Sequence, residues 1–291
     1  MRIALHDTDQ NNFPNLALMK ISAWHKKLGH KVQFFRNTSE LSDIIYSSKV
    51  FSYSKTDPLL PNHVIKGGFG YGKKETLPDM IEHICPDYEL YNLNYSLGFL
   101  TRGCSKKCSW CSVFEKEGLI RAHTDIEEFT RHGEVVLMDN NVLAHSHGIE
   151  QIEKIAQLGL KIDFNQGLDA RLIDDGIARR LAACKWLKPV RLACDTIGHV
   201  KYVHKAVELL RWHNCTPTKF FVYVLVKDVS DAVERVKFLK GLNVDPFAQS
   251  YRDKKGTTPT KEQLRFCKWV NRKQLFKSST WGDYKKNPVS V

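Results

Sequence analysis

The 291-residue sequence has no uninterrupted apolar run long enough to cross a lipid bilayer. Its first residues, MRIALHDTDQ, hold an apolar stretch too short for a secretion signal, and acidic residues follow at once. No internal repeat or low-complexity tract interrupts the pattern. These absences argue against membrane, secreted and repeat proteins, so we expect a cytoplasmic enzyme without membrane contact.

Common signatures of phosphate binding and hydrolysis are also missing. The glycine-rich run GGFGYG at 67–72 does not match the dinucleotide fingerprint G-x-G-x-x-G and lacks the lysine spacing of a P-loop. We interpret it as a tight turn that packs on a neighbouring domain, with phosphate binding as the alternative. No Ser/His/Asp constellation is evident, and His145 and His147 in AHSH are expected to be exposed loop residues.

What is present is typical of a globular protein, with 42% hydrophobic and 26% charged residues. The length allows one large or two modest domains. The net charge is +12, but residues 252–291 hold eleven Lys/Arg against three Asp/Glu. Because most of the net charge belongs to this C-terminal segment, we expect it to face an acidic partner.

Hydrophobic periodicity predicts short strands that alternate with amphipathic helices. In the first hundred residues we expect strands at 2–7, 31–35 and 43–51 and a helix at 15–29. Further strands are expected at 95–103, 134–139, 161–166, 190–195, 219–226 and 244–251. The expected later helices are 124–133 (with Thr124 as N-cap), 148–159, 174–185, 200–212, 230–241 and 260–273.

This order predicts an α/β fold. Six strand–helix units with right-handed crossovers give a parallel sheet, and six fall short of a closed eight-stranded barrel, so we expect a partial (βα)6 TIM-like barrel. The expected domains are a small Rossmann-like α/β unit at 1–96, the barrel core at 97–251, and a basic C-terminal helix and tail at 252–291. Chemistry in such folds lies at the carboxyl ends of the strands.

Three of the eight cysteines are clustered, in GCSKKCSWC. A structural zinc site needs four ligands, and a ferredoxin run has two-residue gaps and a proline. What fits Cys104, Cys108 and Cys111 is a site that is one ligand short, with three thiolates on a [4Fe–4S] cluster whose fourth iron stays open. The other five are expected to be small core residues: Cys85, Cys184, Cys194, Cys215 and Cys267.

The spacing C-x3-C-x2-C, with Trp110 before the last cysteine, resembles the radical SAM superfamily. GFLTRGCSKKCSWC is similar to the version in members with an N-terminal cobalamin-binding-like domain, including uncharacterised phage proteins. The resemblance implies that the open iron binds S-adenosylmethionine (SAM). An electron from a flavodoxin or ferredoxin type of reductant would then cleave SAM to a 5′-deoxyadenosyl radical that acts on a substrate. A zinc-stabilised module without enzymatic activity is the alternative.

The resemblance also implies SAM contacts at strand ends. Relatives often hold the amino group with Gly-Gly-Glu, where this chain reads MDNN. In NQGLDAR a basic side chain could pair with the SAM carboxylate, and an acid in RLACDT could accept the ribose hydroxyls. Helix caps and a salt bridge are the alternatives. The implied cofactor contacts are Trp110, Asp139, Asn140, Asn141, Gln166, Arg171 and Asp195.

The N-terminal unit departs from its relatives. Cobalamin domains that bind the corrin through histidine carry Asp-x-His-x-x-Gly, and the first expected strand here ends in HDTDQNN. We therefore expect His6 to be a polar strand-end residue, and the unit to have a cobalamin-like fold without cobalamin.

The last expected helix has one basic stripe, formed by Lys261, Arg265, Lys268 and Arg272. Trp269 and Phe276 flank it, and cations interleaved with rings suit a nucleic acid base or a tRNA as substrate. The alternative is a solvated helix face whose aromatic residues anchor the tail, with a peptide or small metabolite as the substrate.

Overall fold

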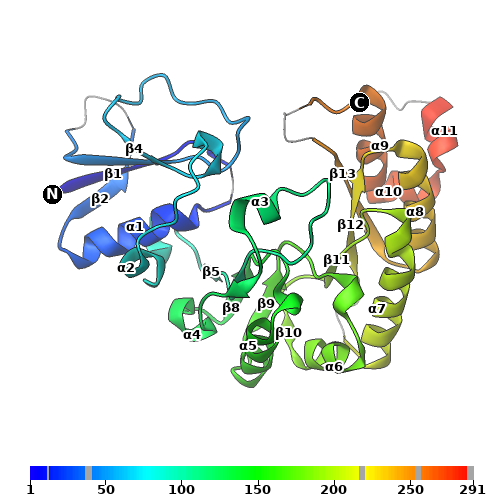
Figure 1. Ribbon diagram of the computed structural model, residues 1–291. Coiled ribbons are helices and arrows are strands. Elements are labelled where there is room, and N and C mark those ends of the chain that lie inside the picture. Colours follow the sequence, from blue (N-terminus) through cyan, green and yellow to red (C-terminus); the bar gives the residue numbers. More distant parts are fainter. Residues whose placement is uncertain (12, 37–40, 216–219, 253–256, 287–291) are drawn as a thin grey trace. The chain divides into compact units, whose positions relative to one another are not determined.

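The structure is a computed structural model that describes residues 1–11, 13–36, 41–215, 220–252 and 257–286 (Figure 1). Contacts divide the chain into two compact units, 1–99 with 123–136, and 100–122 with 137–291. Both units mix helices with parallel strands, which confirms the α/β class. Among the described helices none is long and apolar enough to span a membrane.

The first unit is built on a parallel sheet of order β2-β1-β3-β4. Its elements are β1 (Arg2–Asp7), α1 (Leu16–Lys27), β2 (Lys31–Phe34), β3 (Ile44–Ser48) and β4 (Ile65–Gly67). β1 is covered on both faces, which explains its continuous apolar run. Ile3 and Leu5 pack with α1, while Ala4 packs with Ile45 and Val64 on the other face.

Residues 123–136 belong to the first unit, although the sequence placed them in the barrel domain. α4 (Ile126–Phe129) packs on β5 (Ser96–Gly98), where a Cβ on Gly98 would lie 2.6 Å from the Phe129 ring. The N-cap of α4 is Asp125, whose side chain accepts the Glu127 N–H, so the expected cap Thr124 is wrong. Thr124 instead donates its hydroxyl to the Phe99 carbonyl. This unit also contains α2 (Asp79–Glu82) and 3-10 turns at Phe69–Tyr71 and Tyr88–Tyr91.

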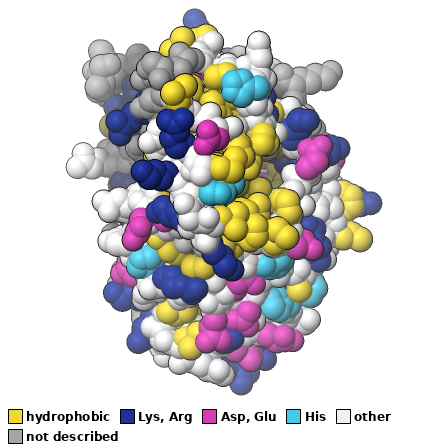
Figure 2. All heavy atoms as spheres, turned by 90° about the vertical axis from the view of Figure 1, so that its left-hand side faces the viewer, with side chains coloured by type: hydrophobic (Ala, Val, Ile, Leu, Met, Phe, Trp, Pro, Cys, Tyr) yellow, Lys and Arg dark blue, Asp and Glu magenta, His cyan; other side chains and the backbone are white. Residues whose placement is uncertain are grey.

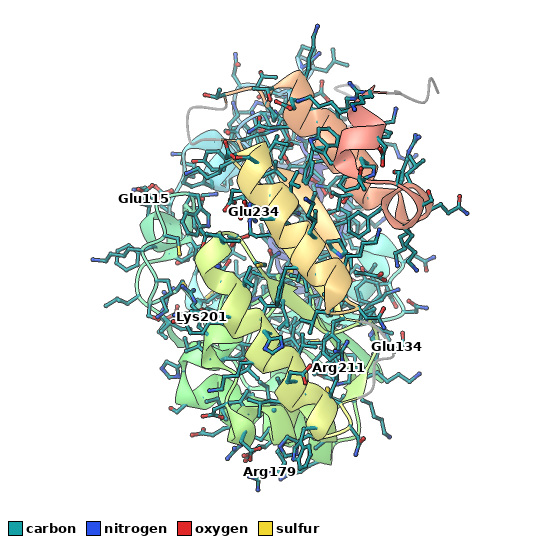
Figure 3. All side chains as sticks on the ribbon, turned by 90° about the vertical axis from the view of Figure 1, so that its right-hand side faces the viewer. Glu115, Glu134, Arg179, Lys201, Arg211 and Glu234 are labelled. Carbon is teal, nitrogen blue, oxygen red and sulfur yellow. The ribbon has the colours of Figure 1, made fainter. Side chains whose placement is uncertain are left out.

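In the second unit parallel strands alternate with helices in the predicted order. The strands are β9 (Lys161–Phe164), β10 (Lys185–Trp186), β11 (Arg191–Ala193), β12 (Phe221–Val226) and β13 (Asp245–Ser250). The helices are α5 (Ser146–Gln157), α6 (Asp175–Ala183), α7 (Val200–Trp212) and α8 (Val229–Gly241). Figure 3 shows α7, which carries Lys201 and Arg211, and α8, which carries Glu234. On α7 the inner stripe Val203, Val207 and Leu210 is fully buried.

One predicted strand is broken. Residues 95–103 divide into β5 and β6 (Thr101–Arg102), and β6 pairs antiparallel with β7 (Arg121–Ala122). The strand predicted at 190–195 is confirmed as β11 beside β12, and β10, which the sequence did not predict, lies beside β9 in a different sheet. An isolated parallel bridge from Leu168 to Leu192 joins the end of β9 to β11. β8 (Glu134–Leu137) leads into the segment Asp139–Asn141.

The C-terminal segment folds on β13 as α9 (Lys261–Asn271), α10 (Lys273–Ser278) and α11 (Trp281–Lys286). Thr260 and Gln263 form a capping box that starts α9. Five aromatic side chains bury one another between these helices, namely Phe266, Trp269, Phe276, Trp281 and Tyr284. The expectation that Trp269 and Phe276 flank the basic stripe is therefore wrong. Residues 253–256 and 287–291 of this basic segment lie outside the described part of the chain.

Charge on the face in Figure 2 is mixed. Lys and Arg side chains are spread over it among hydrophobic ones, while Asp and Glu gather toward its lower end.

Candidate functional site

The cysteine loop is closed at its neck. Gly103 has φ 86°, and a Cβ there would lie 2.4 Å from the Leu119 carbonyl oxygen, so glycine is required. The Gly103 N–H donates to Glu117 at 2.9 Å, and the Cys104 N–H donates to the Gly118 carbonyl at 3.1 Å. α3 (Val113–Glu117), which the sequence left as loop, carries the glutamate of this neck. The two ends of the loop are thus tied together by one backbone bond and one bond to the Glu117 carboxylate.

Each cysteine sulfur of the loop has a hydrogen-bond donor nearby. The Lys106 N–H lies 3.4 Å from the Cys104 sulfur, and the Val113 N–H lies 3.5 Å from that of Cys111. Arg171 hydrogen-bonds Cys108, whose pKa burial raises while this guanidinium opposes the rise. The form that binds metals is the thiolate, and these donors could hydrogen-bond to its sulfur.

The three cysteines line one cavity of about 230 Å³ that is partly open to solvent. Its other walls come from the carboxyl ends of β8, β9 and β11 and from the start of α7. Six of the seven cofactor contacts implied by the sequence line it, namely Trp110, Asn140, Asn141, Gln166, Arg171 and Asp195. The strand-end rule therefore brought together residues that are distant in sequence.

Asp139 is the exception among those seven, because it does not line the cavity. Only 4% exposed, it accepts hydrogen bonds from the Leu100 N–H at 3.1 Å and from the Thr101 N–H at 2.6 Å. The Thr101 hydroxyl donates to it at 2.7 Å. Burial raises the pKa of Asp139, although these bonds act in the opposite direction. Asp139 thus holds the chain that leads into the cysteine loop, and its expected contact with SAM is corrected to a positioning contact.

Asn141 has an unpaired oxygen. Its side chain is buried, and its Nδ2 lies 3.5 Å from the Cys104 sulfur. Within the described residues its Oδ1 has no hydrogen-bond partner. The residue precedes a 3-10 turn (Val142–Ala144) but forms no side-chain cap bond, so the alternative of a helix cap is wrong. A buried acceptor beside a cavity is an observation that calls for a donor from a ligand.

Arg171 pairs with Asp169 in its own loop, at 2.7 Å from Nε to Oδ1 and 2.7 Å from Nη2 to Oδ2. Burial would raise the pKa of Asp169, but the hydrogen bond and charge of Arg171 outweigh it and leave that pKa below its usual value. The salt bridge considered as an alternative is thus present. It holds Arg171 against Cys108, so the same guanidinium serves both a carboxylate and a sulfur.

Asp195 shares the cavity with His199 and Tyr202, which the sequence analysis did not identify as site residues. Burial raises its pKa, while the charges of His199 and Arg235 and a hydrogen bond from Trp110 oppose the rise. Its backbone N–H donates to His199 Nδ1 at 3.3 Å. His199 and Tyr202 line the cavity. Their position one and two turns after a strand-end acid was a signal that could have identified them. The helix that follows, α7, has His199 as its N-cap, so Asp195 does not cap it.

Among the isolated cysteines the prediction of core residues is confirmed for three. Cys184, Cys194 and Cys215 are buried, and burial raises their pKa to about 12, 12 and 11. The expectation for the AHSH histidines is wrong. His145 is half-buried and caps α5 by accepting the His147 N–H at 3.1 Å, and His147 lies within the helix.

Among the described residues no group of three or more His, Cys, Asp or Glu is arranged to hold a single metal ion. In an iron–sulfur cluster each cysteine binds a different iron, so three thiolates surround a volume instead of converging on one point. Three thiols on one cavity wall, with N–H donors to their sulfurs and an unpaired Asn141 oxygen beside them, fit that requirement.

The four residues of the basic stripe differ in exposure and in hydrogen bonding. Lys261, Lys268 and Arg272 are exposed. Arg265 is not available in the same way, because its Nη2 donates to the carbonyls of Tyr284 and Lys285 at 2.8 and 3.0 Å. Arg265 therefore connects α11 to α9.

Comparison with protein-family models finds no match, and comparison with curated proteins finds none either. Among solved structures, the chain is similar to SuiB of Streptococcus suis, in a crystal structure bound to S-adenosylmethionine. The two share 13% sequence identity with a TM-score of 0.43, over 65% of this chain and 49% of that one. This chain thus spans about half the length of that structure.

Proposed function

We propose that this protein is a radical SAM enzyme, in which Cys104, Cys108 and Cys111 hold a [4Fe–4S] cluster. The observation that supports it is the shared cavity, where three thiols meet polar side chains from the ends of successive strands. When bound, the cluster would supply the electron that cleaves SAM to methionine and a 5′-deoxyadenosyl radical.

Asn141 is suited to the SAM amino group. A cysteine thiolate accepts hydrogen bonds but cannot donate, so the Asn141 NH2 faces Cys104 and leaves Oδ1 for an ammonium donor. Asn140 and Gln166 add amide groups to the same wall, and Trp110 adds a ring.

Arg171 and Asp195 are suited to the carboxylate and the ribose of SAM, respectively. Arg171 carries a positive charge next to Cys108 and would attract the SAM carboxylate. Asp195 would accept hydrogen bonds from the ribose hydroxyls. The raised pKa of Asp195 would return toward its usual value when those hydroxyls replace lost water.

The proposal extends to the frame and the partners. We propose that the second unit is a partial (βα)6 barrel, that the first has a cobalamin-like fold without cobalamin, and that a flavodoxin or ferredoxin type of protein delivers the electron. For the substrate we propose a nucleic acid base or tRNA, held by its phosphates on Lys261, Lys268 and Arg272. Because Arg265 donates to the Tyr284 carbonyl, fewer cations of the stripe are available for phosphates, which supports the second candidate, a peptide or small metabolite.

Anaerobic reconstitution tests the chemistry. We expect the wild type to bind iron and sulfide and, after reduction, to release 5′-deoxyadenosine from SAM. Cys108→Ala should abolish that release, whereas Cys267→Ala, a control on α9 outside the cavity, should retain it. Binding of zinc without SAM cleavage would overturn the proposal in favour of a zinc-stabilised module. Deuterium transfer into 5′-deoxyadenosine from labelled nucleic acid or metabolite pools would then identify the substrate.

A further inference from the structure

The glycine run at 67–72 in the first unit builds a feature that the proposed chemistry does not use. The Gly70 N–H donates to the Lys49 carbonyl at 2.8 Å. A Cβ on Gly68 would lie 2.4 Å from that carbonyl oxygen, and one on Gly70 would lie 2.5 Å from the Lys49 side chain. Gly68 also has φ 95°. Glycine is therefore required here because the loop closes directly over Lys49.

Lys49 is buried without an anionic partner. Only 7% of the residue is exposed, and its ammonium lies 5.6 Å from the centre of the Tyr71 ring. Over the described residues it donates no hydrogen bond and forms no ion pair. Lys66 on β4 lies 5.7 Å from the same ring centre and is likewise without a carboxylate. Buried charges are normally paired, so the buried Lys49 ammonium, with a second cation at the same ring, indicates a missing anion.

The position of Lys49 is the one where sheets of this order bind ligands. The strand order β2-β1-β3-β4 reverses direction between β1 and β3, and ligands of open parallel sheets bind outside the carboxyl ends of the strands at that point. Lys49 is the first residue after β3. The N-terminus of α1 lies at the same edge, because Asn15 donates from Nδ2 to the Ser48 hydroxyl at 2.9 Å. α1 has no acidic residue in its first turn.

Acidic groups at this edge already have partners. Asp9 accepts the N–H groups of Val50 and Phe51 at 2.6 and 3.2 Å. Asp57 accepts the Leu59 N–H at 2.8 Å and lies 3.7 Å from His6. These carboxylates accept hydrogen bonds from the chain, whereas among the described residues neither lysine side chain has a hydrogen-bond or ion-pair partner.

Two rings follow Lys49 directly. Phe51 and Tyr53 stack with 5.1 Å between ring centres and an interplanar angle of 18°, and they are 39% and 65% exposed. The Phe51 backbone also borders the glycine loop, because a Cβ on Gly70 would lie 2.7 Å from its carbonyl oxygen. An exposed pair of stacked rings two and four residues after Lys49 is a surface on which a base can stack.

We propose that the first unit binds a nucleoside monophosphate at the carboxyl edge of β1 and β3. Its phosphate lies between Lys49 and Lys66, and its base stacks on Phe51 and Tyr53. The site is independent of the cluster and of SAM, since every residue in it belongs to the first unit.

Calorimetric titration of the full chain with uridine 5′-monophosphate, inorganic phosphate and uridine tests this site. A pyrimidine is chosen so that a site for the adenine of SAM does not interfere. We expect the monophosphate to bind more tightly than either fragment. Lys49→Met and Lys66→Gln should each weaken it about tenfold, the usual loss for a charge-assisted hydrogen bond. Lys31→Gln, which removes an exposed lysine at the start of β2, should change the affinity less than about twofold.

Three results would overturn the site: no binding of the monophosphate to the wild type, equal affinity for phosphate alone, or an equal loss in Lys31→Gln. Because Lys49 is buried, thermal unfolding of Lys49→Met is measured in parallel. If that variant unfolds, Lys66→Gln decides the result, since Lys66 is exposed. The titration uses protein without iron, so its failure leaves the proposed SAM chemistry untouched.

Discussion

Arg235 donates from Nη1 to the carbonyl oxygen of Cys194, 2.6 Å away, and so holds the residue that immediately precedes Asp195. The same side chain reaches the Leu225 carbonyl at 2.9 Å and the Asp231 carboxylate at 2.8 Å, and it is fully buried. One guanidinium on α8 thus fixes the ends of β11 and β12 relative to each other.

Replacing Arg235 with Met should therefore destabilise the protein by about 3 kcal/mol, because two buried carbonyls lose their donor. Urea denaturation measures this loss. Arg211→Met is the matched control, since Arg211 also donates to a backbone carbonyl, that of Leu242, but from the surface. It should cost less than about 1 kcal/mol. Similar losses in the two variants would show that the buried guanidinium has no special role.

Replacing Asp139 with Asn should loosen the approach to the cysteine loop. An amide offers one acceptor oxygen in place of two, while Leu100 and Thr101 present several donors. We expect a loss of about 2 kcal/mol in unfolding free energy. Iron bound per chain after reconstitution should also fall. Asp228→Asn is the control, because asparagine caps α8 as well as aspartate does. Full iron content in Asp139→Asn would contradict the positioning role.

Glu82 predicts acid sensitivity of the first unit. Burial alone would raise its pKa, but His123, 3.2 Å away, and Lys20, 2.9 Å away, lower it to about 2. A carboxylate with a lowered folded-state pKa stabilises the protein above its unfolded value of 4.5 and loses that stabilisation as the pH falls toward 2. The unfolding free energy of the wild type should exceed that of Glu82→Gln by about 2 kcal/mol near pH 6, after allowance for solvent screening. Chemical denaturation across this range should show the difference vanish near pH 2, and a constant difference would contradict the assignment.

The basic stripe can be tested without disturbing the tail. Lys261→Glu/Lys268→Glu/Arg272→Glu should remove salt-dependent RNA binding and leave thermal unfolding unchanged, because these side chains are exposed. Arg265→Gln should do the reverse, since it releases the carbonyls of Tyr284 and Lys285. Filter binding at several salt concentrations measures the first effect. Wild type that binds no RNA at low salt would count against a nucleic acid substrate.

Local pattern was enough for much of the fold. α7 begins and ends where its stripe of Val203, Val207 and Leu210 predicts. A helix with one buried face has apolar residues at helical spacing, which can be recognised in the sequence. Strand ends also located the cavity. Asn141 and Asp195 come from different strands, yet both line it because parallel strands finish at one edge.

The errors have tertiary causes. Asp139 follows β8 as expected for a ligand, but it is buried and accepts hydrogen bonds from a segment that is distant in sequence. The sequence predicts that Trp269 flanks the basic stripe, but it packs against Phe276 on α10 and Trp281 on α11 instead. His199 has no motif of its own, and its place depends on where Asp195 lies in space. Such outcomes depend on contacts between distant segments, which periodicity does not encode.

The neck of the cysteine loop bears on the order of assembly. Gly103 and Cys104 are already tied to Glu117 and Gly118 by the chain's own hydrogen bonds. The conformational entropy of closing this loop is thus lost during folding and not on metal binding. A cluster delivered to the folded chain would meet preassembled thiols, so its insertion can follow folding as a separate, late step of maturation.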